Sequence, residues 1–207
     1  MFRKFHSFII ITYLAVGVFS LINAENGEVT LSKIKKYSAY FYKAAKIFNI
    51  NADYLKAIVY VERTENMDWR DEALDILLAK KGYNSSVGFC QIKLKTAYWI
   101  EIQLSDSASE FFPGKKYKAL LKISKTNDEL IKKLQNDSLN ILYAAAYLRI
   151  IQSYWTKLGF SIDNKPEILG TLYSAGLFNS DGTIRNPNAK PKENQFGIKV
   201  IKILNIF

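Results

Sequence analysis

The sequence predicts a mainly α-helical protein with at most a small β-hairpin. Over most of its 207 residues, apolar side chains recur every three or four positions, which is the spacing of one buried helix face. The exception is 82–92, where Gly, Asn and two Ser precede Val87, Phe89 and Ile92, as in a turn that leads into a short extended piece. The composition, 49% hydrophobic and 23% charged, is typical of a globular chain, and no linker divides it. We therefore expect one domain.

Caps and breakers place the helices in order. The first is expected after a cap at Thr30 or Ser32. Its apolar face consists of Ile34, Tyr37, Phe41, Ala44, Ala45 and Phe48. Asn51 is expected to cap a second helix, because Asn is a favoured N-cap residue. One face of that helix carries Leu55, Ile58, Val59 and Glu62. Further helices are predicted over 71–80, 127–135 and 137–157, from Pro166 to near Gly176, and over 191–207.

Residues 1–24 have the pattern of a secretory signal peptide. Arg3 and Lys4 precede an uncharged apolar run over 8–22, and the small residue Ala24 ends the segment. We expect cleavage after Ala24, a mature chain of residues 25–207, and a location in the periplasm or outside the cell. The alternative is an uncleaved membrane anchor, because the run is only slightly shorter than a bilayer span.

Few residues are present for metal or imidazole chemistry. The chain has one His, His6 within the leader, and one Cys, Cys90. These two side chains cannot supply the ligands of an ordinary zinc site, and catalysis by a Ser-His-Asp or Cys-His set would lack its base. Carboxylates, Lys and Tyr remain for acid/base work. We expect neither a metal nor a cofactor.

Glu62 is the candidate acid. It ends an otherwise apolar helical face, and apolar surroundings raise the pKa of a carboxyl group toward ~6, where it can act as a general acid near neutral pH. The alternative is that the helix frays here and Glu62 pairs with a cation in solvent, as most Glu residues do.

Three segments, in this order along the chain, resemble motifs of the soluble lytic transglycosylases. Glu62-Arg63 is similar to the Glu-Ser motif of that family, 88–91 (Gly-Phe-Cys-Gln) to its Gly-Leu-Met-Gln motif, and 173–176 (Tyr-Ser-Ala-Gly) to its Tyr-Asn-Ala-Gly motif. Between the last two lies the predicted helix 137–157, with Asn140-Ile141 and 145–148 (Ala-Ala-Tyr-Leu). The resemblance covers residues 35–204, nearly the whole mature chain.

This resemblance implies a lysozyme-like helical bundle around a cleft and an enzyme that cuts peptidoglycan glycan strands. It implies that Glu62 is the single catalytic acid/base and that Tyr173 lies near its carboxylate and helps to position it. The residues implied to bind substrate are Gln91, Tyr173, Gly88, Phe89 and Ser174. The implied product carries a 1,6-anhydromuramoyl end, and no second carboxylate is required, unlike in ordinary glycoside hydrolysis.

The chain also departs from the family pattern. Arg63 replaces the usual Ser, and we expect it to point away from Glu62, since adjacent helical residues do not share a face. Cys90 replaces Met, and we expect a small buried apolar side chain there rather than a reactive thiol. Gly82 and Lys93 stand where a substrate-contacting Ser and a second Met are usual. Residues 68–81 look like an insertion at the cleft.

Two alternative functions remain open. One is a hydrolysing muramidase, in which a carboxylate of the insertion positions a water molecule; its candidates are Asp68, Asp71, Glu72 and Asp75. These residues otherwise form a solvated acidic helix. The other is a non-catalytic peptidoglycan-binding or assembly protein that keeps the fold without the reaction.

The net charge of +10 is consistent with an anionic partner; the alternative is that a Lys-rich composition follows from codon bias alone. The 29 basic residues are mostly Lys and are scattered along the chain, whereas nucleic-acid binding proteins cluster Arg and Lys in a recognisable module. We expect a monomer drawn to the anionic cell envelope and no nucleic-acid partner. Trp69 and Trp99 are candidates for stacking on sugar rings, and Trp155 is expected to pack in the core.

Overall fold

The structure is a computed structural model that describes residues 25–65 and 72–207. The predicted leader therefore lies outside the described residues, as do Asp68, Trp69 and Asp71. In chain order the helices are α2 (Gly27–Lys36), α3 (Ser38–Phe48), α4 (Ala52–Glu65), α5 (Glu72–Lys80), α6 (Leu94–Ser105), α7 (Asn127–Gln135), α8 (Asp137–Lys157), α9 (Pro166–Ala175) and α10 (Gln195–Ile203). The strands β1 (Ser86–Val87) and β2 (Ile92–Lys93) form an antiparallel hairpin. The predicted mainly α-helical fold with a small hairpin is confirmed.

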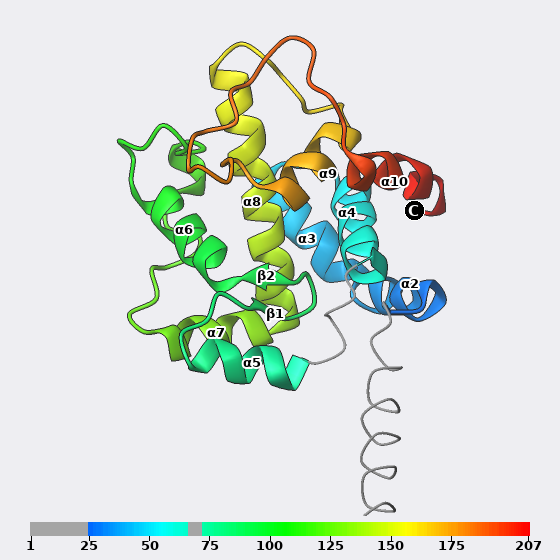
Figure 1. The fold of residues 1–207 in the computed structure, drawn as a ribbon, viewed down its shortest axis with the longest axis vertical. Helices are drawn as coiled ribbons and strands as arrows, with labels where there is room; N and C mark the ends of the chain where they lie inside the picture. Colours follow the sequence, from blue (N-terminus) through cyan, green and yellow to red (C-terminus); the bar gives the residue numbers. More distant parts are fainter. Residues whose placement is uncertain (1–24, 66–71) are drawn as a thin grey trace, which may run out of the picture.

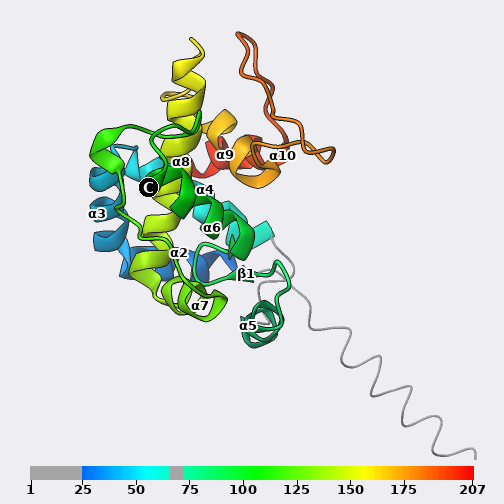
Figure 2. The same ribbon diagram turned by 90° about the vertical axis from the view of Figure 1, so that its left-hand side faces the viewer.

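The long helix α8 forms the centre of the fold (Figure 1), and α3, α6, α7 and α9 pack against it. Its middle is a run of fully buried small residues, 144–146 (Ala-Ala-Ala), which allows the neighbouring helices to approach closely. Helix α4 packs against α2, α3, α9 and α10, and the hairpin lies between α5, α7 and α8. A quarter turn of the molecule (Figure 2) shows the long loop between α9 and α10 extending away from the helices.

Several predicted boundaries are confirmed. Helices α7 and α8 have the predicted bounds. The Asn51 side chain caps α4 by accepting hydrogen bonds from the backbone N–H groups of Asp53 (2.8 Å) and Tyr54 (3.1 Å). Trp155 is buried in the core, as expected.

The predicted start of the first helix is wrong. The helix begins at Gly27, because Asn26 is the N-cap and accepts a hydrogen bond from the Glu28 N–H (2.8 Å). Thr30 lies within α2, where its hydroxyl donates to Glu25 instead of capping a helix end. The helical segment is also interrupted at Tyr37, which separates α2 from α3.

Two further predictions need correction. The terminal helix starts at Gln195 rather than at Pro191, because Asn194 caps it through the Gly197 N–H (2.9 Å). The sequence pattern also failed to predict α6. Within the described ranges, no helix is both long enough and apolar enough to cross a membrane.

Candidate active site

An open cleft of about 480 Å³ brings together four of the residues that the resemblance singles out. They are Glu62 from α4, Gln91 from the hairpin turn, and Tyr173 and Ser174 from α9. The other lining residues are Asp75, Asn84, Ser85, Ser86, Ile92, Lys93, Thr96, Tyr147, Ala175 and Gly176. Most of them carry hydroxyl, amide or charged groups, so the cleft suits a ligand rich in polar groups.

Burial of one face of α4 determines where Glu62 lies. Leu55, Ile58 and Val59 on this helix are completely buried, and Glu62 follows one turn later at the edge of the core, where it is half-buried. Glu65, at the end of the helix, is exposed and forms an ion pair with Lys199 of α10. Glu62 is thus the carboxylate that α4 presents to the cleft, whereas Glu65 belongs to the surface.

The turn that carries Gln91 is held by Asn140, a buried residue near the start of α8. The Asn140 side-chain oxygen accepts a hydrogen bond from the Cys90 N–H (2.6 Å). Its amide nitrogen donates to the carbonyl oxygens of Val87 (2.9 Å) and Leu134 (2.8 Å). Asn140 lies in a segment that resembles the family, but the sequence does not predict this role, because Cys90 and Val87 lie 50 and 53 residues away and leave no local pattern.

Gln91 itself has a left-handed backbone, with φ of 53°. This conformation costs a non-glycine residue conformational free energy, so the surrounding structure must stabilise it. Such residues are enriched at functional sites. The Gln91 side-chain amide donates to the carbonyl oxygen of Gly88 (3.1 Å), which fixes its direction at the edge of the cleft.

Tyr173 connects α9 to the same turn. Its hydroxyl donates to the carbonyl oxygen of Cys90 (2.9 Å). Burial raises the pKa of Tyr173 well above its ordinary value, and the negative charge of Glu62 acts in the same direction. The hydroxyl is therefore a hydrogen-bond donor near Glu62 and is unsuited to act as a base.

The structure places Gly88 and Phe89 outside this cleft. The Phe89 ring packs edge-on against Tyr37 (centroids 5.1 Å apart) and lies under the guanidinium of Arg63 (4.3 Å). Both residues line a second cavity of about 320 Å³, and Gln91 borders both cavities. Gly88 and Phe89 thus determine the shape of the turn and do not form the wall of the cleft. The backbone of the turn directs the Phe89 side chain into the core.

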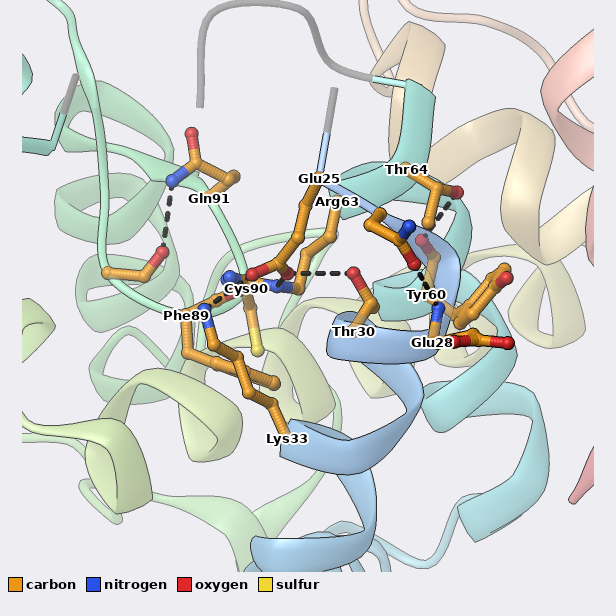
Figure 3. A network of polar contacts seen from close by, with 12 residues as sticks. Glu25, Glu28, Thr30, Lys33, Tyr60, Arg63, Thr64, Phe89, Cys90 and Gln91 are labelled. Atoms are coloured by element: carbon orange, nitrogen blue, oxygen red, sulfur yellow. Dashed lines mark hydrogen bonds and ion pairs between the residues drawn. The ribbon is translucent and has the colours of Figure 1, made fainter. Parts of the chain in front are cut away.

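The two departures next to the motif residues are both buried. Cys90 is completely inaccessible, and burial raises the pKa of its thiol, so it is an inert apolar residue as expected. The guanidinium of Arg63 donates from Nε to Glu25 (2.7 Å) and from Nη1 to the carbonyl oxygen of Phe89 (2.8 Å). Figure 3 shows the Arg63 and Glu25 side chains directed toward each other.

The insertion contributes one described side chain to the cleft, the half-buried Asp75 of α5. Trp99 does not line the cleft. It packs edge-on against Phe111, Tyr147 and Phe178, with ring centroids 5.2, 6.2 and 6.0 Å away. Among the described residues, no three His, Cys, Asp or Glu side chains are grouped so that they would hold a metal ion.

Asn140→Ala is expected to lower the free energy of unfolding by about 3 kcal/mol, since it leaves buried backbone groups of the turn without partners. Urea denaturation followed by circular dichroism measures this loss. Ser138→Ala, on the same helix and half-buried, is the control and is expected to change stability by less than about 0.5 kcal/mol. Equal stability of the two variants would contradict the role given to Asn140.

Comparison with known proteins finds no family model and no curated protein that matches the chain.

Proposed function

We propose that the protein is a peptidoglycan lytic transglycosylase that acts outside the cytoplasm and cleaves the β-1,4 bond between N-acetylmuramic acid and N-acetylglucosamine. The observation that carries this proposal is the meeting of Glu62, Gln91 and Tyr173 in one cleft. These residues come from three segments far apart in the sequence, and each segment resembles a motif of that family.

In the proposed reaction, Glu62 acts first as the acid and then as the base. Its carboxyl proton passes to the glycosidic oxygen, the bond from that oxygen to the anomeric carbon of the muramoyl residue breaks, and the N-acetylglucosamine end leaves as an alcohol. The Glu62 carboxylate then takes the proton of the muramoyl C6 hydroxyl, and this oxygen bonds to the anomeric carbon. The product is a 1,6-anhydro ring, and Glu62 is protonated again.

The other cleft residues bind and orient the strand. The Gln91 amide borders the cleft, where it can exchange hydrogen bonds with sugar hydroxyl or acetamido groups. Ser174 is exposed at the cleft and offers a hydroxyl. Tyr173 maintains the distance between α9 and the turn through its hydrogen bond to Cys90.

Digestion of purified peptidoglycan by the processed protein, followed by mass spectrometry of the released fragments, tests this function. Fragments that end in anhydromuramic acid, lighter by one water than hydrolysed ones, are the expected result. Reducing muramic acid ends would establish a muramidase instead. Release of no fragment, together with binding to the peptidoglycan, would establish a non-catalytic wall protein.

One observation favours the muramidase as a second candidate: Asp75 lines the same cleft as Glu62. In an inverting hydrolase, a second carboxylate positions the attacking water on the opposite face of the sugar. Asp68, Asp71 and the side chain of Glu72 lie outside what the structure describes, so Asp75 is the carboxylate to test.

For the transglycosylase, Asp75→Asn is expected to retain turnover within about threefold of wild type and to give the same anhydro ends, because no water is activated. For a muramidase, loss of the base would lower turnover by ~100-fold or more. Release of fragments from peptidoglycan measures the difference. Asp128→Asn, an exposed substitution in the first turn of α7, is the control.

A further inference from the structure

We propose that Arg63 and Glu25 form a buried positioning pair that holds helix α4, and with it Glu62, against the turn that carries Gln91. This inference rests on the proposed function for its catalytic consequence. Arg63 follows Glu62 directly in the chain, and its side chain contacts Glu25 and the Phe89 backbone (Figure 3).

The contacts of Arg63 join three separate parts of the chain. Its side chain and that of Glu25 are each only 3% exposed, and they meet at 2.7 Å. Its second donor reaches the carbonyl oxygen of Phe89, two residues before Gln91. The Phe89 ring lies under the guanidinium, which adds a cation–π contact at 4.3 Å. The planar guanidinium can make these contacts together, whereas an ammonium group cannot.

Glu25 is itself held in place by several donors. Its carboxylate also accepts hydrogen bonds from the Thr30 hydroxyl (2.7 Å) and from the Lys33 ammonium. Burial by itself would raise the pKa of Glu25, but the hydrogen bonds from Arg63, Lys33 and Thr30 outweigh it, and the pKa is lowered. Glu25 therefore stays ionised and balances the buried positive charge of Arg63.

The backbone of Glu25 contributes as well. Its nitrogen, which becomes the α-amino group if the chain is cleaved after Ala24, donates to the carbonyl oxygen of Arg63 (3.3 Å). This is one of the carbonyl groups that the end of α4 leaves without a helical partner. Glu25 thus holds both the main chain and the side chain of Arg63. These two contacts fix the position of Arg63 near the end of α4, and Arg63 is the residue next to Glu62.

The test compares Arg63→Met, Glu25→Gln and the double variant. Glu25→Gln leaves the buried charge of Arg63 without its carboxylate, and Arg63→Met leaves Glu25 paired with the less buried Lys33, so both are expected to lower the urea midpoint. The double variant removes both charges, and its urea midpoint is expected to return most of the way to the wild-type value. Its kcat for peptidoglycan cleavage should remain about 100-fold below wild type, with KM within about threefold, because the bond to Phe89 is still missing.

The Glu65–Lys199 ion pair supplies a matched control at the same end of α4. Its side chains are 45% and 43% exposed, so Lys199→Met is expected to leave the midpoint and kcat close to wild type. Arg63→Lys retains the positive charge but lacks the planar guanidinium. Compared with Arg63→Met, it is expected to restore more of the lost stability than of the lost kcat. Recovery of kcat along with stability in the double variant would show that the pair is merely structural and overturn the proposal.

A readout without substrate separates this inference from the proposed function. The Gln91 side-chain amide gives NMR signals that are expected to shift in the double variant and to stay in place in Lys199→Met. If the wild-type protein cleaves no peptidoglycan, the proposed function fails, yet these signals still report whether Arg63 holds the turn. Unchanged Gln91 signals in the double variant would overturn the positioning role whatever the activity.

Discussion

Glu62→Gln is expected to lower kcat for peptidoglycan cleavage by at least ~1,000-fold, because an amide has no proton to give to the glycosidic oxygen and cannot take one from the C6 hydroxyl. The substitution keeps the size and polarity of the side chain, so binding to glycan strands should change little. Glu62 lies at the edge of the core rather than within it, so the variant is expected to fold. The loss of kcat would then not be caused by unfolding.

The matched control is Glu65→Gln, less than one helical turn further along α4. Glu65 is exposed and pairs with Lys199 at the surface, so its replacement is expected to leave kcat within about twofold of wild type. Both variants are assayed by release of soluble fragments from peptidoglycan and by co-sedimentation with it. Equal release by wild type and Glu62→Gln would end the enzymatic interpretation of this cleft.

Gly88→Ala is expected to give the largest loss of stability, about 4 kcal/mol, from strain in a left-handed backbone and from overpacking. Gly88 has φ of 77°, and an added Cβ would lie 2.1 Å from the carbonyl oxygen of Leu134 and 2.3 Å from the side-chain nitrogen of Asn140. The methyl group would therefore displace the Asn140 side chain, whose hydrogen bonds hold the turn.

Gly82→Ala separates the two contributions. Gly82 also has a left-handed backbone, with φ of 87°, but an added Cβ there meets no atom within 4 Å. Its replacement is expected to cost only the backbone strain, about 1 kcal/mol. Urea denaturation of both variants measures the difference, and equal losses would show that the close approach of Gly88 to Asn140 is unimportant.

The helices predicted best are those whose ends carry strong local signals. Thr126 and Asn136 are capping residues whose side chains accept hydrogen bonds at the starts of α7 and α8, and Pro166 begins α9. Helix α6, in contrast, begins without a capping side chain. It buries Glu101 and Gln103 among its apolar residues, so its pattern looks interrupted.

The partners that allow Glu101 to be buried come from elsewhere in the chain. Its carboxylate accepts hydrogen bonds from the backbone and hydroxyl of Ser124 (2.7 and 2.8 Å), from Tyr143, and from Lys133 (3.1 Å). A sequence pattern along one helix contains no information about such partners, so the pattern does not predict α6.

The same distinction applies to the cleft. Local motifs pointed to Glu62, Gln91, Tyr173 and Ser174, and all four line it. The residues that hold these side chains in place, Asn140 and Glu25, act through contacts 50 and 38 residues away. Glu25 belongs to no motif, and the segment that contains Asn140 gave no indication of this role. Gly88 and Phe89 belonged to a motif, but they serve the shape of the turn instead of the cleft wall.

The turn at 88–91 has a consequence for the order of folding. Three hydrogen bonds hold this turn, and they join it to residues far away in the sequence. The separation is 26 residues to Arg63, 50 residues to Asn140 and 83 residues to Tyr173. Contacts between residues so distant in sequence form late, because each closes a long loop at an entropic cost. A chain that is still emerging, and lacks α9, cannot assemble the cleft. Any activity of this protein therefore begins only when nearly its whole length has folded.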